Sequence, residues 1–286
     1  MLNQGWERLA DTLQNVVNTL VGAKGSGRHP IKTLLNGTWL RHPLHPLLTD
    51  VAVGGAVLAT ALDVIWLAVP GAGVWAPRAA EAVVIATALA FIAAFFTGWT
   101  DWSDTYGPER STGLWHGLLN SAVLVLYIIS AILRLRLGDG RSVVAAVLGF
   151  VSFATLAVAA YLGGHMVFKY GTNVNHTAWE HGADDFEAIG PLEQISDNTL
   201  SRVVVGGVPV VLLRQGDKLA ALAATCTHAG GPLDEGELLP GNVVKCPWHG
   251  SRFRMESGRV VDGPATMAEP RYLVRIREGQ VELKRA

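Results

Sequence analysis

Hydrophobic residues fill long unbroken runs in the first 165 positions of the chain and short alternating runs in about the last hundred. Four of the long runs have about the 20 residues that a helix needs to cross a hydrocarbon layer of about 30 Å. They are apolar on every side, unlike the helices of a water-soluble bundle. We therefore predict a four-helix transmembrane bundle within residues 30–175. The expected spans are about 46–69, 79–98, 114–133 and 142–163.

The N-terminal residues 1–29 have a different pattern. Their apolar positions recur at helical spacing between polar residues, which predicts an amphipathic helix followed by a linker of sequence GAKGSGRHP. Such a helix either lies along the membrane surface or caps the bundle. The apolar positions are Leu2, Trp6, Leu9, Leu13, Val16, Val17 and Leu20.

After residue 166 the chain becomes polar, and residues 176–185 read as a linker. From residue 199 onward, short β-rich runs are joined by Gly-Gly, Gly-Asp and Glu-Gly pairs, which is a hairpin signature. Residues 186–286 are therefore expected to form an all-β domain. The predicted fold class is multi-domain: an all-α four-helix transmembrane bundle followed by an all-β domain.

Composition agrees with a membrane protein and excludes one class of partner. Charged residues make up 16% of the chain, below the roughly 25% of soluble domains. The net charge is −1, without a basic stripe, so the chain has no electrostatic basis for binding nucleic acid. The two cysteines cannot form a disulfide framework, and their spacing suits a metal site.

Both cysteines stand beside histidines on glycine-rich stretches. Cys226-Thr-His228 and Cys246-Pro-Trp-His249 offer two thiolates and two imidazoles from two loops. A [2Fe–2S] centre of the Rieske type uses this set, with cysteines on one iron and histidines on the other. A Cys₂His₂ zinc site is the alternative. Zinc fingers use pairs of cysteines and pairs of histidines, so the mixed pairs favour the cluster.

The segments CTHAGGPL, CPWHGSRF and GPA resemble those of the Rieske ferredoxin family, over residues 186–286. The resemblance implies that Cys226 and Cys246 hold the inner iron and that His228 and His249 hold the outer one. It also implies that Gly263-Pro264 covers the other side of the cluster, so that Pro264 belongs to its surroundings.

The chain departs from one branch of that family. In the respiratory and photosynthetic Rieske proteins each cluster loop carries a further cysteine, and the two form a disulfide; the matching positions here are Gly231 and Trp248. Ser251 is kept and can donate a hydrogen bond to a sulfide, but Phe253 replaces a tyrosine and cannot. Fewer hydrogen bonds to the sulfurs predict a low reduction potential, toward about −150 mV.

The histidines of the membrane half gather at one face of the predicted bundle. His45, His116 and His165 lie at helix ends on that face, beside His42. Ionisable residues in such positions are candidates for function, and a b-type haem with two of these imidazoles as ligands, or a quinone pocket, are the hypotheses. Interfacial histidines also cap helix ends. Asp63 falls in the middle of the first span and requires a hydroxyl partner or a polar pocket.

RHPLHPLL, GWTDW, WHGLLN and GGHMVFKYGTNV resemble a bacterial four-helix membrane family with an RHPLHP signature, over about 30–175. The resemblance implies topology rather than activity. Six lysines and arginines flank the histidine-bearing face and four flank the other, which places the first face in the cytoplasm. We predict a multi-pass protein of the cell inner membrane with a cytoplasmic β domain.

HTAWEH, with His176 and His181 before two aspartates, is spaced like a mononuclear iron site. Rieske oxygenases carry such a motif in a large catalytic domain that this sequence lacks, so a solvated linker is the favoured interpretation.

The predicted function is a membrane-anchored one-electron carrier. Its low-potential cluster would pass electrons between a soluble or membrane donor and a membrane haem or quinone. The expected partners are the lipid bilayer and a redox partner protein. Since the domain itself breaks no substrate bond, it offers no catalytic residue. Two alternatives remain: an electron-transfer component of a membrane reductase or oxygenase acting on a lipophilic substrate, and a redox sensor.

Overall fold

The computed structural model describes residues 4–23 and 27–286. Leu2 of the predicted amphipathic helix and residues 24–26 of the predicted linker lie outside these ranges. The chain divides into two compact units. The bundle unit contains Met1–Val21 and Leu44–Tyr170, and the β unit contains Gly22–Pro43 and Gly171–Ala286.

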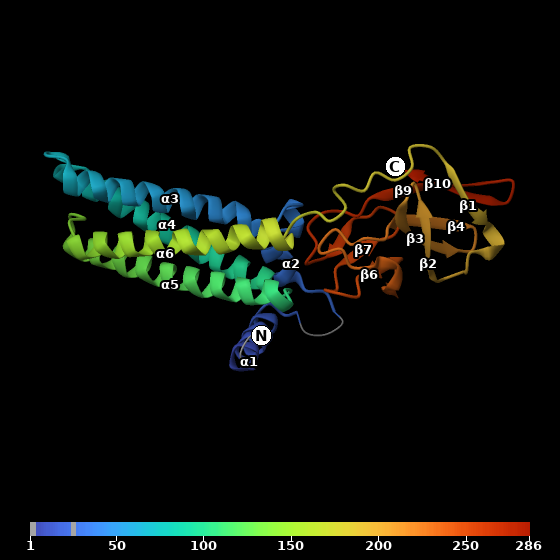
Figure 1. The fold of residues 1–286 in the computed structure, drawn as a ribbon, viewed down its shortest axis with the longest axis horizontal. Helices are drawn as coiled ribbons and strands as arrows, with labels where there is room; N and C mark the ends of the chain where they lie inside the picture. Colours follow the sequence, from blue (N-terminus) through green and yellow to red (C-terminus); the bar gives the residue numbers. More distant parts are fainter. Residues whose placement is uncertain (1–3, 24–26) are drawn as a thin grey trace. The chain divides into compact units, whose positions relative to one another are not determined.

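Four long helices lie side by side in the bundle unit (Figure 1). Each is long and apolar enough to cross a membrane, and each overlaps one of the four predicted spans. Only 28–33% of the residues in their apolar windows are buried inside the protein, so most apolar side chains face outward. A bundle of this kind is suited to lipid, and the four helices point to a multi-pass membrane protein. They are α3 (Leu44–Ala68), α4 (Ala76–Trp102), α5 (Gly107–Leu137) and α6 (Val143–His165).

Small residues let the helices of the bundle approach closely. Ala52, Ala56 and Ala59 of α3 are buried against α4 residues that include Val84 and Ala88. Close contact of this kind is how helices associate in a membrane, where lipid removes the hydrophobic driving force between them. Short 3₁₀ and π-helical turns, Ala72–Val74 and Met166–Tyr170, follow α3 and α6.

A buried ion pair lies inside the bundle. Asp63 of α3 and Arg134 of α5 are 1% and 0% exposed, and their side chains meet at 2.6 Å. From the sequence, Asp63 was expected to meet a hydroxyl or a polar pocket, and Arg134 is one of the four basic residues counted at the face opposite the histidines. The arginine instead folds back into the bundle from the last turn of α5, because a carboxylate in that interior requires an opposite charge.

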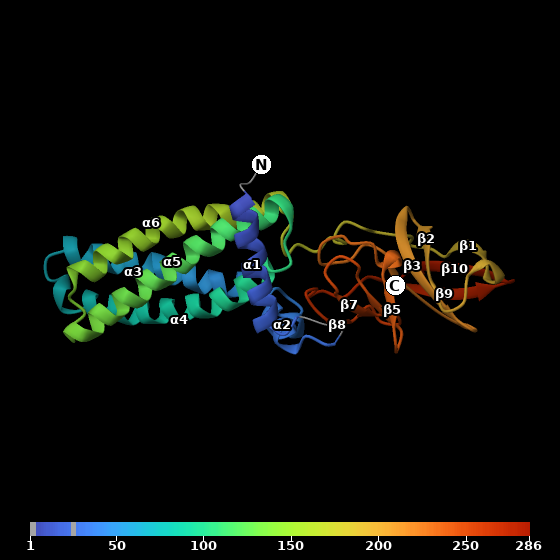
Figure 2. The same ribbon diagram turned by 90° about the horizontal axis from the view of Figure 1, so that it is seen from below.

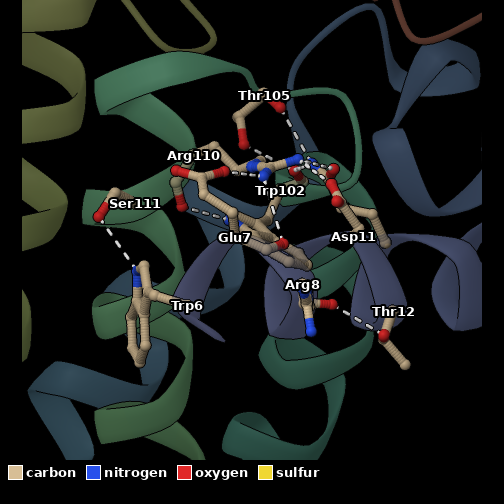
Figure 3. A network of polar contacts seen from close by, with 10 residues as sticks. Trp6, Glu7, Arg8, Asp11, Thr12, Trp102, Thr105, Arg110 and Ser111 are labelled. Carbon is tan, nitrogen blue, oxygen red and sulfur yellow. Dashed lines mark hydrogen bonds and ion pairs between the residues drawn. The ribbon is translucent and has the colours of Figure 1, made fainter. Parts of the chain in front are cut away.

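Helix α1 (Gln4–Leu20) rests on one end of the bundle, where it contacts α4 and α5. Figure 2 shows it lying across these helices. Its polar contacts are drawn in Figure 3: Arg110 pairs with Glu7 and, at 2.6 Å, with Asp11, and Trp6 Nε1 donates to Ser111 Oγ at 3.2 Å. These contacts are the ones expected of a helix that caps the bundle.

Two antiparallel sheets form the β unit (Figures 1 and 2). The larger has the strand order β1-β10-β9-β4-β3-β2 and the smaller β5-β6-β7-β8. The predicted hairpins appear as β2-β3-β4 and β9-β10, so the all-β expectation is confirmed. The strands are β1 (Glu187–Pro191), β2 (Leu200–Val205), β3 (Val208–Gln215), β4 (Lys218–Ala223), β5 (Glu237–Leu239), β6 (Val243–Lys245), β7 (Arg252–Arg254), β8 (Val260–Asp262), β9 (Arg271–Arg277) and β10 (Gln280–Arg285).

The β unit takes in two segments that the sequence analysis assigned elsewhere. Residues 30–43, expected in the membrane domain, form α2 (Pro30–Asn36) and a 3₁₀ turn at Thr38–Leu40, and they pack on the loop after β8. Residues 176–185, expected as a linker, are also bonded to this unit, for example by Arg285 N–H donating to Ala183 O at 2.9 Å. Hydrogen bonds between residues far apart in the sequence, which composition does not reveal, set these boundaries.

Candidate metal centre

Two loops of closely similar backbone hold the cysteines. In the loop after β4, Cys226 N–H donates to the carbonyl five residues on (2.8 Å), and Gly230 N–H donates back to Cys226 O (2.8 Å). The loop between β6 and β7 repeats both bonds around Cys246, at 2.8 and 3.1 Å, with Gly250 in the matching position. Gly230 and Gly250 have φ of +79° and +76°, so this closure requires a residue without a side chain there.

The loops bring two thiols together and two imidazoles together. Cys226 and Cys246 are 1% and 2% exposed and hydrogen-bond to each other. Their sulfurs accept backbone N–H groups, from His228 at Cys226 and from Trp248 and His249 at Cys246. In the free thiols, the mutual bond lowers the pKa of Cys246 to about 7, while the same bond and burial raise the pKa of Cys226. The rings of His228 and His249 have centres 4.9 Å apart.

This donor set fits a two-iron cluster better than one zinc ion. Zinc needs four ligands around one point, and within the described ranges no three His, Cys, Asp or Glu side chains converge on such a point. His228 Nδ1 is buried without a hydrogen-bond partner among the described residues, which is unusual for a ring nitrogen. A Cβ at Gly231 would come within 2.9 Å of Cys246 Sγ, so the loop leaves the sulfur room that a side chain would fill.

The other predicted surroundings lie where the loops meet. Ser251 Oγ accepts the Ala265 N–H at 3.0 Å, which leaves its hydroxyl hydrogen to donate elsewhere. Phe253 is fully buried in the core beside the cysteines. Pro264 lines a small hollow with His228, whereas Trp248 is 53% exposed.

Residues 29–38 cover the loop that carries Pro264. Thr33 Oγ1 donates to Asp262 Oδ1 at 2.5 Å and accepts the Gly263 N–H at 3.2 Å. Thr38 Oγ1 donates to Ala265 O at 2.9 Å. Pro30 at the first turn of α2 and Gly37 at its end, in the left-handed region with φ of 89°, were the available sequence signal for this short helix.

Three further side chains lie near the centre, a position that the sequence did not predict for any of them. Lys32 of α2 is 6% exposed and close enough to affect the charge state of His228. The His176 ring packs on Gly230, and the backbone N–H of His176 donates to Thr227 O at 3.2 Å. Glu269 accepts the Thr227 N–H at 2.6 Å, and burial raises its pKa well above the usual value. Among the described residues, His176 and His181 do not form part of a metal-binding group.

The bundle unit brings together two of its three candidate histidines. The rings of His45 and His116 have centres 6.3 Å apart, with planes at 89°. His165 instead lies against Tyr161 and Tyr170, with ring centres 6.3 and 5.5 Å away. His42 is bonded to the carbonyl of the next residue.

Comparison with known proteins agrees with both units. Residues 186–276 match the Rieske [2Fe-2S] domain family, and residues 41–176 match the family described as predicted membrane protein (DUF2231). Ferredoxin CarAc of Metapseudomonas resinovorans is 38% identical over 77 residues, which cover 27% of this chain and 71% of that protein. The anthranilate 1,2-dioxygenase ferredoxin subunit of Burkholderia cepacia is 29% identical over 35% of this chain and 91% of its own length.

Among solved structures, the ferredoxin of carbazole 1,9a-dioxygenase from Nocardioides aromaticivorans IC177 is 24% identical, with a TM-score of 0.34 over 35% of this chain and 97% of its own. The fold and the matches define an iron–sulfur electron carrier joined to a multi-pass membrane domain. The chain belongs to the Rieske [2Fe-2S] family through its β unit and carries a DUF2231 membrane domain before it, as the two resemblances in the sequence implied.

Proposed function

We propose that this chain is a membrane-anchored one-electron carrier that uses a low-potential Rieske [2Fe–2S] cluster. The observation that carries the proposal is the pairing of two thiols and two imidazoles on loops with the same backbone closure. When bound, such a cluster accepts and releases single electrons without breaking a substrate bond.

Each of the four side chains has a defined role in this proposal. Cys226 and Cys246 hold the inner iron, in the buried part of the site. His228 and His249 hold the outer iron, nearer the surface. The sulfurs accept hydrogen bonds from backbone N–H groups. These bonds stabilise the thiolate form that binds metal, and they also stabilise the reduced state of the cluster.

The surroundings favour a low potential. Ser251 supplies a hydroxyl close to the loops, while Phe253 supplies none, and Gly231 and Trp248 exclude a disulfide between the loops. Electrons exchange with a partner through the side of the cluster near His249, because Trp248 next to it is 53% exposed whereas Pro43 and Asn173–Asn175 line the hollow beside His228.

The electron route joins a redox partner protein to an acceptor in the membrane, a haem or a quinone. We place the four helices in the cell inner membrane with the β unit in the cytoplasm, on the basis of the lysine and arginine bias in the sequence.

The test is purification of the full chain in mild detergent, followed by metal analysis and EPR after reduction by dithionite. Two irons per chain and an EPR signal that appears only on reduction, as for a [2Fe–2S] cluster, are expected. Stoichiometric zinc without iron would contradict the cluster. A redox titration monitored by EPR then measures the potential.

A second candidate, an electron-transfer component of a membrane oxygenase, is favoured by the names of the relatives. CarAc is a ferredoxin, and the Burkholderia cepacia relative is a ferredoxin subunit of a dioxygenase. This candidate predicts that the reduced chain passes its electron to a terminal oxygenase in stopped-flow mixing. A chain that reduces only a membrane acceptor would exclude it.

A further inference from the structure

The bundle repeats one arrangement of three residues around its two central histidines. In the α3–α4 hairpin, His45 lies against Gly98, and its Nδ1 is 3.0 Å from Ala94 O, four residues before that glycine. In the α5–α6 hairpin, His116 lies against Gly163, and its Nδ1 is 2.8 Å from Ala159 O, again four residues before the glycine.

The carbonyls fix the tautomer of both rings. A carbonyl oxygen only accepts, so Nδ1 of each ring carries the hydrogen and donates it. The lone pair of each ring is therefore on Nε2; in His116 this nitrogen lies 3.3 Å from Asn120 Nδ2, an amide that a bound metal would displace. Histidines that bind metals ordinarily donate their other N–H to a carbonyl or carboxylate in this manner.

The separation of the rings also suits a shared metal. Two imidazoles that bind one metal from opposite sides, with bonds of about 2.0–2.1 Å, have ring centres roughly 6 Å apart. The observed separation is 6.3 Å. The rings come from α3 and α5, which do not form one of the major helix contacts of the bundle, so they meet across its interior.

Both glycines are needed for the arrangement. A Cβ at Gly98 would come within 2.6 Å of His45 Cε1, and one at Gly163 within 2.8 Å of His116 Cε1. Among the described residues, the hydrogen-bond partners of the two rings are carbonyl, hydroxyl and amide groups and include no carboxylate. Apolar side chains would be sufficient to pack the interior of the bundle. Polar groups inside a membrane bundle are therefore candidates for function by default.

We propose that His45 and His116 are the two axial ligands of a haem within the bundle, bound through their Nε2 atoms. Haem is a ligand that accepts two opposed imidazoles and supplies the other four donors itself. Bundle interiors are a common location for such cofactors, with ligands on facing helices. His165, which lies against tyrosines away from the pair, is not a ligand.

A haem at this site is the membrane acceptor for electrons from the cluster. This role rests on the proposed function, but the haem site itself does not depend on it. With both groups bound, the redox partner protein would supply one electron to the cluster, and the cluster would pass it on to reduce ferric haem iron to ferrous. No bond forms or breaks, and no proton is needed.

The experiment measures haem in the full chain, produced in cells supplied with iron and a haem precursor. We expect a Soret band and about one haem per chain by the pyridine haemochrome assay. His45→Ala and His116→Ala should each lose the band, and added imidazole should restore it in His116→Gly. His165→Ala and His42→Ala are the matched controls and should keep it. Gly98→Leu and Gly163→Leu should lose haem, and Gly54→Leu, whose added side chain has open space, should not.

The EPR signal of the cluster, recorded on every variant, separates this proposal from the proposed function. A wild-type chain with a full cluster signal and no Soret band would overturn the haem site alone. So would haem that persists in both histidine variants, or a quinone or copper found in its place. Haem without a cluster signal would leave the site standing and overturn the proposed carrier.

Discussion

The two units solve the same problem by different means. Each brings a pair of ligands together by repeating one local arrangement: two cysteine loops in the β unit, and two histidine–glycine helix pairs in the bundle. In the loops, ligand, glycine and closing hydrogen bonds lie within six consecutive residues. In the bundle, 49 residues separate His45 from the carbonyl that orients it. An arrangement formed by neighbouring residues can be recognised as a sequence motif, whereas one that depends on the packing of distant helices cannot.

The difference also sets how each site tolerates change. A cysteine loop is closed by its own backbone hydrogen bonds, so its geometry depends little on the rest of the sheet. The imidazole pair depends on the register of four helices, and therefore on the packing of the whole bundle. The four predictions that follow separate the two sites, from the largest expected effect to the smallest.

Loss of a ligand should remove one centre and leave the other intact. His228→Ala should abolish the EPR signal of the cluster, because the outer iron loses half of its protein ligands, and it should leave the Soret band unchanged. His116→Ala should have the opposite effect. The measurement is EPR and optical spectroscopy on the same samples, with His181→Ala as the histidine control for both. Loss of both signals in either variant would show that the sites are not independent.

Breaking the buried ion pair should destabilise the bundle without affecting the cluster. Arg134→Ala leaves Asp63 as an uncompensated charge in an apolar interior, at a cost of about 3–5 kcal/mol. Thermal unfolding of the helical circular dichroism signal in detergent should show the loss, while the EPR signal persists. Arg136→Ala, at an exposed position on the same helix, is the matched control. An unchanged transition would show that the pair contributes little.

The four membrane helices and the two cluster loops could be predicted from the sequence, for physical reasons. A membrane span has to be apolar all round, so α3–α6 are visible as runs, and the cluster loops are visible because their ligands and glycines are close together. What could not be predicted involves contacts between distant segments. Lys32 and Thr33 belong to a short polar helix whose place is set by hydrogen bonds to Asp262 and Gly263. Asp63 was noticed, but its partner lies 71 residues away.

Removing one hydrogen bond near the cluster should have a smaller effect, a shift of the cluster's reduction potential. Ser251→Ala removes the hydroxyl expected to donate to a sulfide, so the reduced cluster is less stabilised. A loss of about 1 kcal/mol lowers a one-electron potential by roughly 40 mV, since 59 mV corresponds to a tenfold change. An EPR-monitored redox titration measures the shift, and Ser257→Ala, at a half-buried position in the turn after β7, is the control. A raised potential would show that Ser251 does not donate to the cluster.

The smallest expected effect comes from Lys32, which tests whether the segment before the bundle tunes the cluster. This side chain is 6% exposed, and its positive charge is among the causes, after burial and the neighbouring His249, that lower the pKa of the free His228 imidazole to about 3. A positive charge stabilises the reduced cluster, which carries one more negative charge, so Lys32→Met should lower the potential. The shift should be smaller than that of Ser251→Ala because no hydrogen bond to sulfur is lost. Lys32→Arg should restore most of the potential, and Lys218→Met, which removes an exposed charge of the same unit, should change nothing. If Lys32→Met and Lys218→Met titrate alike, residues 29–38 only cover the cluster, and the potential is set within the two cysteine loops.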